Sequence, residues 1–265
     1  MSFFFLIILG LSPSILWLLY FLRKDVHPEP KLMVLKIFFW GALITLPAFF
    51  IERGLFEVLT IFKIPQIFYI FLGIAGVEEI LKFLVVKEKV ISDPEFDEPL
   101  DAPLYMIISA LGFAGVENIL YLFSASNLTE IFTINLFRFV GAVFLHALCS
   151  GSWGYFLALS FLKSRQKIKF FSAGLLTAIG AHGLFNFSLK NLEKSIMVIQ
   201  NIETQEITIS ILNFHLFVSS FVTIFVILLG LLVFLLQGFK KLKQLKSICQ
   251  PEIALTKTEN QNKIK

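Results

Sequence analysis

Long apolar runs separated by short polar segments dominate the chain. Seven of them are long enough to cross a bilayer, which takes about 20 helical residues. They cover residues 3–22, 33–52, 67–87, 104–124, 136–161, 170–189 and 210–238. Few of the runs alternate polar and apolar residues, so a β-barrel is not expected. The pattern predicts an all-α fold, a polytopic transmembrane bundle of about seven helices.

The polar segments between the runs differ in charge from one side of the membrane to the other. Most Lys and Arg residues lie in four alternate segments, RKDVHPEPK, KEKVISDPEFDEPLDAP, KSRQKIK and KKLKQLK. Basic loops remain in the cytoplasm, so this predicts an N-terminus outside and a C-terminus inside. The first run has Arg23 and Lys24 directly after it and no basic stretch before it. That arrangement favours a retained helix over a cleaved signal peptide.

Composition agrees with a membrane protein and limits its partners. Of the 265 residues, 57% are hydrophobic and 16% are charged, whereas soluble domains carry about 25% charge. The net charge of +4 comes mostly from basic residues beside the apolar runs, so it does not indicate nucleic-acid binding. We expect one transmembrane domain at 1–240, whose motif-bearing core covers about 70–190, and a basic to polar cytoplasmic tail at 241–265.

Ionisable side chains inside the apolar runs are few, and each costs about 2.5–3.5 kcal/mol at the centre of a membrane helix. They are Glu78, Glu79 and Lys82 in the third run, Glu117 in the fourth, His146 in the fifth and His182 in the sixth, accompanied by Asn118 and Asn186. Counted from the outer end of each run, the acids and imidazoles lie roughly 10–18 Å deep at 1.5 Å per residue. Four helices thus place them in one layer, in the outer half of the membrane.

These residue types predict water chemistry in that layer. Carboxylates and imidazoles in a medium of low dielectric can bind and deprotonate a water. Two His and one or two Glu also match a zinc site that keeps a position open for water. Lys82, four residues after Glu78, is expected to orient one carboxylate. Successive helical residues point about 100° apart, so Glu78 and Glu79 are not expected to face the same partner; Glu78 is the favoured catalytic residue.

Each residue also has a structural explanation. The acids and Lys82 can form an ion pair between helices, and the histidines can be interhelical hydrogen-bonding groups. Cys149, three residues after His146, can be a nucleophile, although a buried Cys usually packs as a small hydrophobic residue. Arg138, near the end of a run, is expected to extend its charge to the membrane surface.

The order of these motifs resembles the PrsW family of intramembrane proteases, part of a wider group with the CAAX prenyl proteases and the CPBP (Abi) membrane proteins. The resemblance rests on EExxK at 78–82, FxxxEN at 113–118, the histidine of FLHALCSGSWGY at 144–155 and HxxxN at 182–186, in order on successive runs. The CAAX-protease pattern has Arg one place after Lys82 and His in place of Glu117. The chain is therefore more similar to the PrsW branch.

The resemblance implies a multi-pass endopeptidase of a bacterial inner (plasma) membrane. Its substrate would be a single-pass membrane regulator such as an anti-sigma factor, cut near the extracytoplasmic face. In one version of the mechanism Glu78, with His146 or Glu117, activates water, while His182 and Asn186 stabilise the oxyanion. In the other version Zn²⁺ is bound by His146, His182 and Glu117, with Glu78 or Glu79 as the base. Lys82 and Asn118 support either version.

A non-proteolytic membrane protein is the alternative. Buried carboxylates and histidines also form the proton relays of transporters, and an inactive scaffold of the same family would keep the motifs. The sequence has no Pro-broken helix near Glu78 of the kind that transporters use to expose backbone carbonyls, which favours the protease.

Overall fold

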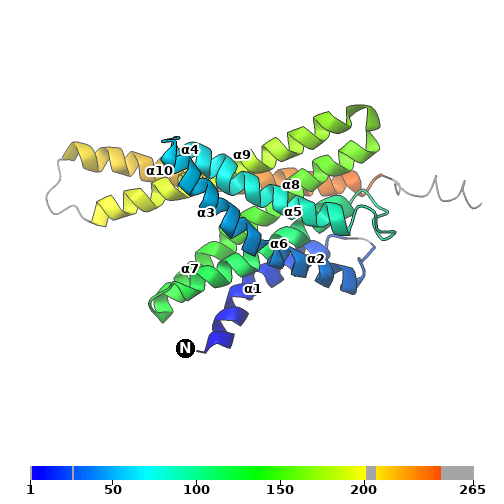
Figure 1. Ribbon diagram of the computed structural model, residues 1–265, viewed down its shortest axis with the longest axis horizontal. Coiled ribbons are helices and arrows are strands. Elements are labelled where there is room, and N and C mark those ends of the chain that lie inside the picture. Colours follow the sequence, from blue (N-terminus) through cyan, green and yellow to red (C-terminus); the bar gives the residue numbers. More distant parts are fainter. Residues whose placement is uncertain (1, 26, 201–206, 246–265) are drawn as a thin grey trace, which may run out of the picture.

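The computed structural model is a bundle of seven helical rods (Figure 1). It describes residues 2–25, 27–200 and 207–245, which contain no strand. The helices are α1 (Phe3–Leu22), α2 (Lys31–Leu43), α3 (Thr45–Ile61), α4 (Gln66–Phe68), α5 (Val77–Lys89), α6 (Asp101–Phe123), α7 (Leu128–Val140), α8 (Ala142–Leu162), α9 (Lys167–Gln200) and α10 (Ile207–Leu242). A π-helical segment, η1 (Tyr69–Gly76), joins α4 to α5, and a 3₁₀ turn, η2 (Ser164–Gln166), follows α8. The prediction of an all-α bundle is confirmed.

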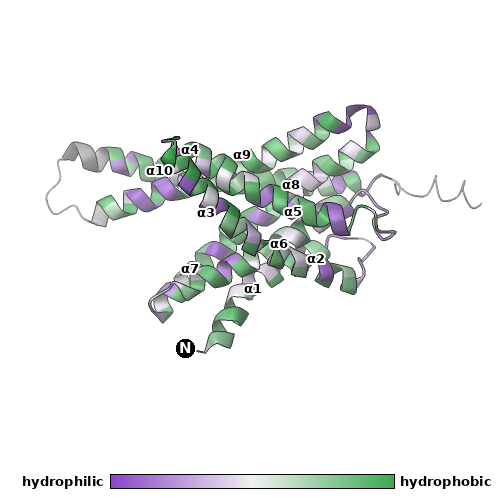
Figure 2. Ribbon diagram, in the orientation of Figure 1, coloured by the Kyte–Doolittle hydropathy of each residue, from purple (hydrophilic) through white to green (hydrophobic). Residues whose placement is uncertain are grey.

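Six helical stretches in the described part are long and apolar enough to cross a membrane. They are Phe3–Leu22, Lys31–Ile61, Asp101–Phe123, Leu128–Leu162, Ser164–Val198 and Leu212–Leu242. Several exceed the expected runs because helix continues into the flanking polar sequence, as the purple bands at the helix ends in Figure 2 show. The seventh rod, formed by α4, η1 and α5, carries the charged residues of the third expected run. Six of the seven expected runs therefore correspond to these stretches, and the third, 67–87, is not among them.

The connections between the rods gather at two ends of the bundle. The α1–α2, α5–α6 and α8–α9 connections and the end of α10 lie at the right in Figure 1, whereas the N-terminus, the α3–α4 connection and the α6–α7 connection lie at the left. The described residues of the four basic segments are all at the right-hand end. We call this end the basic end. Of the expected tail at 241–265, residues 246–265 lie outside the described residues.

Helix α6 is the centre of the bundle and is buried along most of its length. It packs against α1, α2, α5 and α8. At its contact with α2 the two backbones touch, because a Cβ at Gly112 would overlap the carbonyl oxygen of Phe38 and one at Gly41 would overlap that of Ser109. Only glycine allows so close an approach. The contact fixes the height at which α6 presents Glu117.

Two irregular segments set the direction of the polar side chains that lie inside the bundle. The π-helical turns of η1 come immediately before Glu78, and such segments occur often at functional sites. The ring of Phe71 in η1 lies on Gly183 of α9, where a Cβ would come within 2.5 Å of it. This contact holds the start of α5 against α9. At Gly141 the backbone (φ −106°, ψ −93°) breaks the rod between α7 and α8, which turns α7 toward α6.

Candidate active site

Six ionisable side chains from four helices lie in contact inside the bundle. They are Glu78, Glu79 and Lys82 of α5, Glu117 of α6, His146 of α8 and His182 of α9. The first three and the two histidines are at most 4% exposed. The two imidazole rings meet edge to face with centroids 4.9 Å apart. The residues that the sequence placed at one depth therefore form one cluster, which we call the Glu–His cluster.

Lys82 lies at the centre of this cluster. Its Nζ donates to Glu78 Oε2 at 3.1 Å, to Glu79 Oε1 at 2.9 Å and to His146 Nδ1 at 2.8 Å. The expectation that the two glutamates would not share a partner is therefore wrong. Residues three and four positions before a lysine lie on the same side of the helix, one above the other, so both carboxylates reach it.

The two glutamates differ in how many of their oxygens are engaged. Glu79 Oε1 accepts from Lys82 and, at 3.0 Å, from His182 Nδ1, and Glu79 Oε2 accepts from Ser150 at 2.6 Å. Glu78 is bonded through Oε2 alone, and its Oε1 makes no hydrogen bond to the described residues. Glu79 is thus held on both sides, and Glu78 keeps a free oxygen.

The carboxylates also define which histidine nitrogens carry protons. Because carboxylates accept, His182 Nδ1–H donates to Glu79, and His146 Nε2–H donates to Glu117 Oε2 at 2.9 Å. The opposite nitrogens then present lone pairs toward Glu78 Oε2, His146 Nδ1 at 3.6 Å and His182 Nε2 at 3.9 Å. Lys82 engages the first of these lone pairs, so the lone pair of His182 Nε2 is the one left for a ligand or a water.

Arg138 is the second partner of Glu117, beside His146. Its Nη2 lies 3.0 Å from Glu117 Oε2, and its guanidinium lies 4.1 Å from the ring centre of Tyr121. The side chain is 12% exposed, so the expectation that it extends to the membrane surface is wrong. The break at Gly141 turns the end of α7 toward α6, where the half-buried carboxylate of Glu117 attracts the guanidinium. An available sequence signal was the pair Asn135 and Arg138, one turn apart in an otherwise apolar run.

Asn118 links this region to the first helix. It accepts a hydrogen bond from Arg138 Nε at 3.0 Å, while its amide donates to the Gly10 carbonyl at 2.8 Å and to Asn135 Oδ1 at 2.9 Å. These bonds tie α6 to α1 and α7. Asn118 therefore supports the position of its neighbour Glu117 without contacting the cluster itself.

The remaining candidates lie at the edge of the cluster or outside it. Asn186, one turn after His182, is half-buried and makes no hydrogen bond to the described residues of the cluster. Cys149 is fully buried in the core of α8. Phe113 covers the cluster, with Lys82 Nζ 4.5 Å from its ring centre. Ser150 was missed by the sequence reasoning, although its place four residues after His146 puts it on the same helix face.

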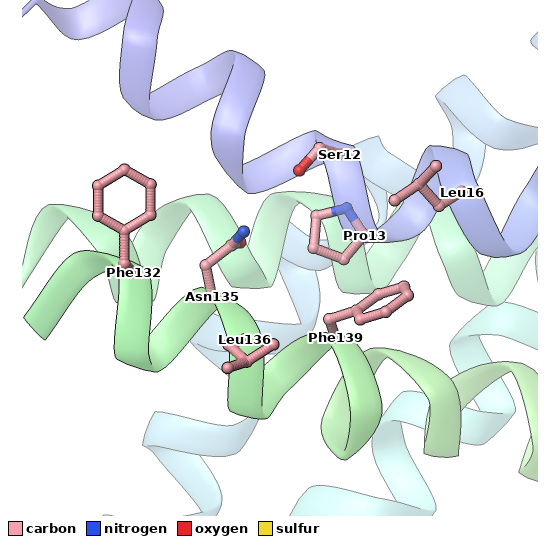
Figure 3. Close-up of a pocket in the computed structure, with 7 residues that line it drawn as sticks. All are labelled: Ser12, Pro13, Leu16, Phe132, Asn135, Leu136 and Phe139. Carbon is pink, nitrogen blue, oxygen red and sulfur yellow. The ribbon is translucent and has the colours of Figure 1, made fainter.

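Two hollows of similar size differ in their relation to the cluster. One, of about 340 Å³, lies between α1 and α7 (Figure 3); apart from Ser12 and Asn135 its lining is apolar, and it contains none of the cluster residues. The other, of about 360 Å³, lies between α3 and η1 and is lined by Phe49, Glu52, Arg53, Phe56, Glu57 and Tyr69. Glu52 is within electrostatic reach of Glu78, Glu117 and Lys82. Neither hollow is lined by a residue of the cluster, but the lining of the second includes a carboxylate that interacts electrostatically with it.

Glu78, His146 and His182 can together hold a metal ion, since each offers a ligand atom within 4.8 Å of the other two. Glu79 and Glu117 brace the second nitrogen of each imidazole, as carboxylates do for histidines in metal sites. The expected ligand set included Glu117 in place of Glu78. In the structure Glu117 accepts from His146 Nε2 and pairs with Arg138, so it stands behind the ligand group. The donor types and their bracing fit a divalent metal.

Comparison with known proteins identifies the relatives of the chain. Residues 29–233 match the model of a family described as PrsW family intramembrane metalloprotease. The chain is 31% identical over 191 residues to Protease PrsW of Oceanobacillus iheyensis (72% of this chain, 85% of the relative) and 34% identical over 187 residues to that of Geobacillus kaustophilus (70% and 80%). It is 32% identical over 182 residues to Protease PrsW of Bacillus subtilis (68% and 80%). No solved structure matches the chain at a significant level.

Six apolar helices and bacterial relatives identify a multi-pass bacterial membrane protein. The family model covers more than half of the chain, and the curated relatives that it matches carry the name of a protease. The alternative of a transporter is thereby set aside. The chain belongs to the PrsW family of intramembrane proteases.

Proposed function

We propose that the Glu–His cluster is the active site at which the chain cuts a single-pass membrane protein. Glu78 is the general base. The observation that carries the proposal is the contrast between the two glutamates. Glu79 is engaged on both oxygens, whereas Glu78 keeps Oε1 free, and the unengaged Nε2 of His182 lies 3.9 Å from its other oxygen, Oε2. A water that hydrogen-bonds to both groups would be held between a proton acceptor and a second fixed polar atom.

In this mechanism the Glu78 carboxylate removes a proton from the water as its oxygen attacks the peptide carbonyl carbon. The proton then passes from Glu78 to the leaving amine, and the C–N bond breaks. Lys82 holds the Glu78 carboxylate in place through the 3.1 Å bond. A positioned general base of this kind contributes about 10²–10⁴-fold in rate.

A divalent metal bound by Glu78, His146 and His182 would supply a Lewis acid and a water with a lowered pKa. Glu79 and Glu117 would then keep the two imidazoles in the tautomers that leave a lone pair for it. With Glu78 as a ligand, its uncoordinated oxygen would still accept the proton of the water.

The substrate site is proposed to lie in the outer half of the membrane. Three cluster residues are 15 or 16 residues from the helix ends at the basic end, counted as Asp101 to Glu117, His146 to Leu162 and Lys167 to His182. At 1.5 Å per residue this is about 22–24 Å of a core about 30 Å thick. If the basic end is cytoplasmic, the cut falls toward the extracytoplasmic face. A regulator of the anti-sigma-factor type, with one membrane helix, fits that position.

The test is cleavage of a tagged single-pass substrate by purified protein in proteoliposomes. We expect Glu78→Gln and His182→Ala to lower the rate at least about 100-fold. The matched controls are Glu57→Gln on α3, 63% exposed, and His215→Ala on α10, also exposed, and both should cleave normally. Mass spectrometry of the products locates the cut. Wild-type rates for Glu78→Gln and His182→Ala at equal protein abundance would reject the proposal.

A further inference from the structure

The ammonium of Lys82 lies against donor atoms that a metal would use. It is fully buried and spends all three of its N–H bonds on Glu78, Glu79 and His146. Two of these partners, Glu78 and His146, belong to the group that can hold a metal. The chain therefore already places one positive charge inside its own ligand set.

The geometry leaves little room for a second cation. On His146 the Nε2–H donates to Glu117, so Nδ1 has the only lone pair, and that lone pair accepts from Lys82. Nδ1 and Glu78 Oε2 are 3.6 Å apart, and Nζ lies 2.8 and 3.1 Å from them. A zinc ion about 2.1 Å from each of the two atoms would then lie within about 3.5 Å of Nζ.

Two like charges so close in a buried site repel each other strongly, because little solvent screens them. The ammonium is also fixed from other sides. Glu79 holds it at 2.9 Å, and the ring of Phe113 covers it at 4.5 Å. A metal must therefore displace an ammonium that is held by four neighbouring groups.

We propose that Lys82 is the resident cation of the Glu–His cluster and that a divalent metal binds Glu78, His146 and His182 only in competition with it. The inference rests on the proposed function because it concerns the same cluster. It assigns a second role to Lys82, which sets how readily the donors take up a metal. It does not depend on whether cleavage uses a metal.

The test measures metal binding without substrate. Purified wild type and Lys82→Met, a neutral side chain of similar length, are titrated with Zn²⁺ in equilibrium dialysis and with Co²⁺ by visible absorption. We expect Lys82→Met to bind one ion per chain at least about tenfold more tightly than wild type. The added His182→Ala substitution should abolish that gain. Lys82→Arg, which retains the charge, should bind no better than wild type.

The matched control is Lys87→Met, a lysine on the same helix that is 54% exposed and should leave metal affinity unchanged. Thermal unfolding shows whether each variant is folded. If Lys82→Met does not fold, the double variant Lys82→Met with Glu79→Gln is used instead. It removes the Glu79 carboxylate, which has lost its lysine partner, and keeps all three metal donors. Equal affinity of wild type and the folded Lys82 variant overturns the inference. Cleavage by the same preparations, with and without chelator, tests the proposed function separately.

Discussion

Two polar clusters among the described residues combine several acids with a histidine, and they differ in what they leave unengaged. The Glu–His cluster lies among α5, α6, α8 and α9. The second cluster, which we call the loop cluster, lies where the α1–α2 and α5–α6 connections meet at the basic end. It joins Glu29 to Tyr105 by a hydrogen bond, Asp101 to the backbone N–H groups of Asp97 and Glu98, and His27 to Glu98 at 2.6 Å. Both clusters combine acids with a histidine.

The clusters differ in what is left unengaged. In the loop cluster Asp101 Oδ2 closes the connection by accepting from two backbone N–H groups, and His27 is 74% exposed. In the Glu–His cluster Glu78 Oε1 and His182 Nε2 make no hydrogen bond to the described residues, while every other member is fixed by at least two partners. We infer that burial of acids alone does not make a candidate active site. Such a site also needs free lone pairs that are surrounded by fixed neighbours.

The largest expected effect separates the two glutamates of the Glu–His cluster. Glu78→Gln should remove cleavage while leaving the protein folded, since Glu79 still pairs with Lys82. Glu79→Gln should lower the free energy of unfolding by about 3 kcal/mol, because it breaks a buried ion pair with three partners. Cleavage rate and thermal unfolding in one detergent measure both. Equal behaviour of the two variants would show that the difference in their hydrogen bonding has no functional meaning.

The next effect concerns the support behind the cluster. Arg138→Met should lower kcat about 10–100-fold with little change in KM, because Glu117 then no longer orients His146. Arg138→Lys, which retains the charge, should recover part of the loss. The matched control is Arg53→Met, since Arg53 forms an exposed pair with Glu57 on α3 at 3.5 Å. A change confined to KM would place Arg138 at the substrate instead.

Sequence reasoning found the spans and the members of the Glu–His cluster for one physical reason. Charge is costly in a membrane, so each of Glu78, Glu117, His146 and His182 stood out against its apolar run. Their depth along each helix then predicted that they lie at one level of the membrane. Both inferences need only residue type and helical rise.

What the sequence did not predict depends on helix rotation and bending. The π-helical turns of η1 rotate α5 relative to an ideal helix, and the break at Gly141 turns Arg138 inward. Neither the π-helical segment nor the break at Gly141 has a strong signal in the local sequence. Glu117, expected as a metal ligand, instead accepts from His146 Nε2 and pairs with Arg138. Residue lists give the members of a site, whereas their order around its centre requires the packed structure.

The smallest effect is expected in the loop cluster. Burial raises the pKa of Glu29 to about 9, with Asp101 and Asp25 adding to the rise and the Tyr105 hydroxyl opposing it. The folded protein therefore retains a proton on Glu29 that the unfolded chain releases near pH 4.5, so its stability falls as pH rises from about 5 to 9. Because Glu29 is partly exposed, we expect a fall on the order of 1 kcal/mol. Glu29→Gln should flatten this slope in thermal unfolding at pH 5 to 9 and leave cleavage unchanged. If stability still falls with pH in Glu29→Gln, another group is responsible for the pH dependence. If Glu29→Gln loses cleavage, the two clusters are functionally coupled.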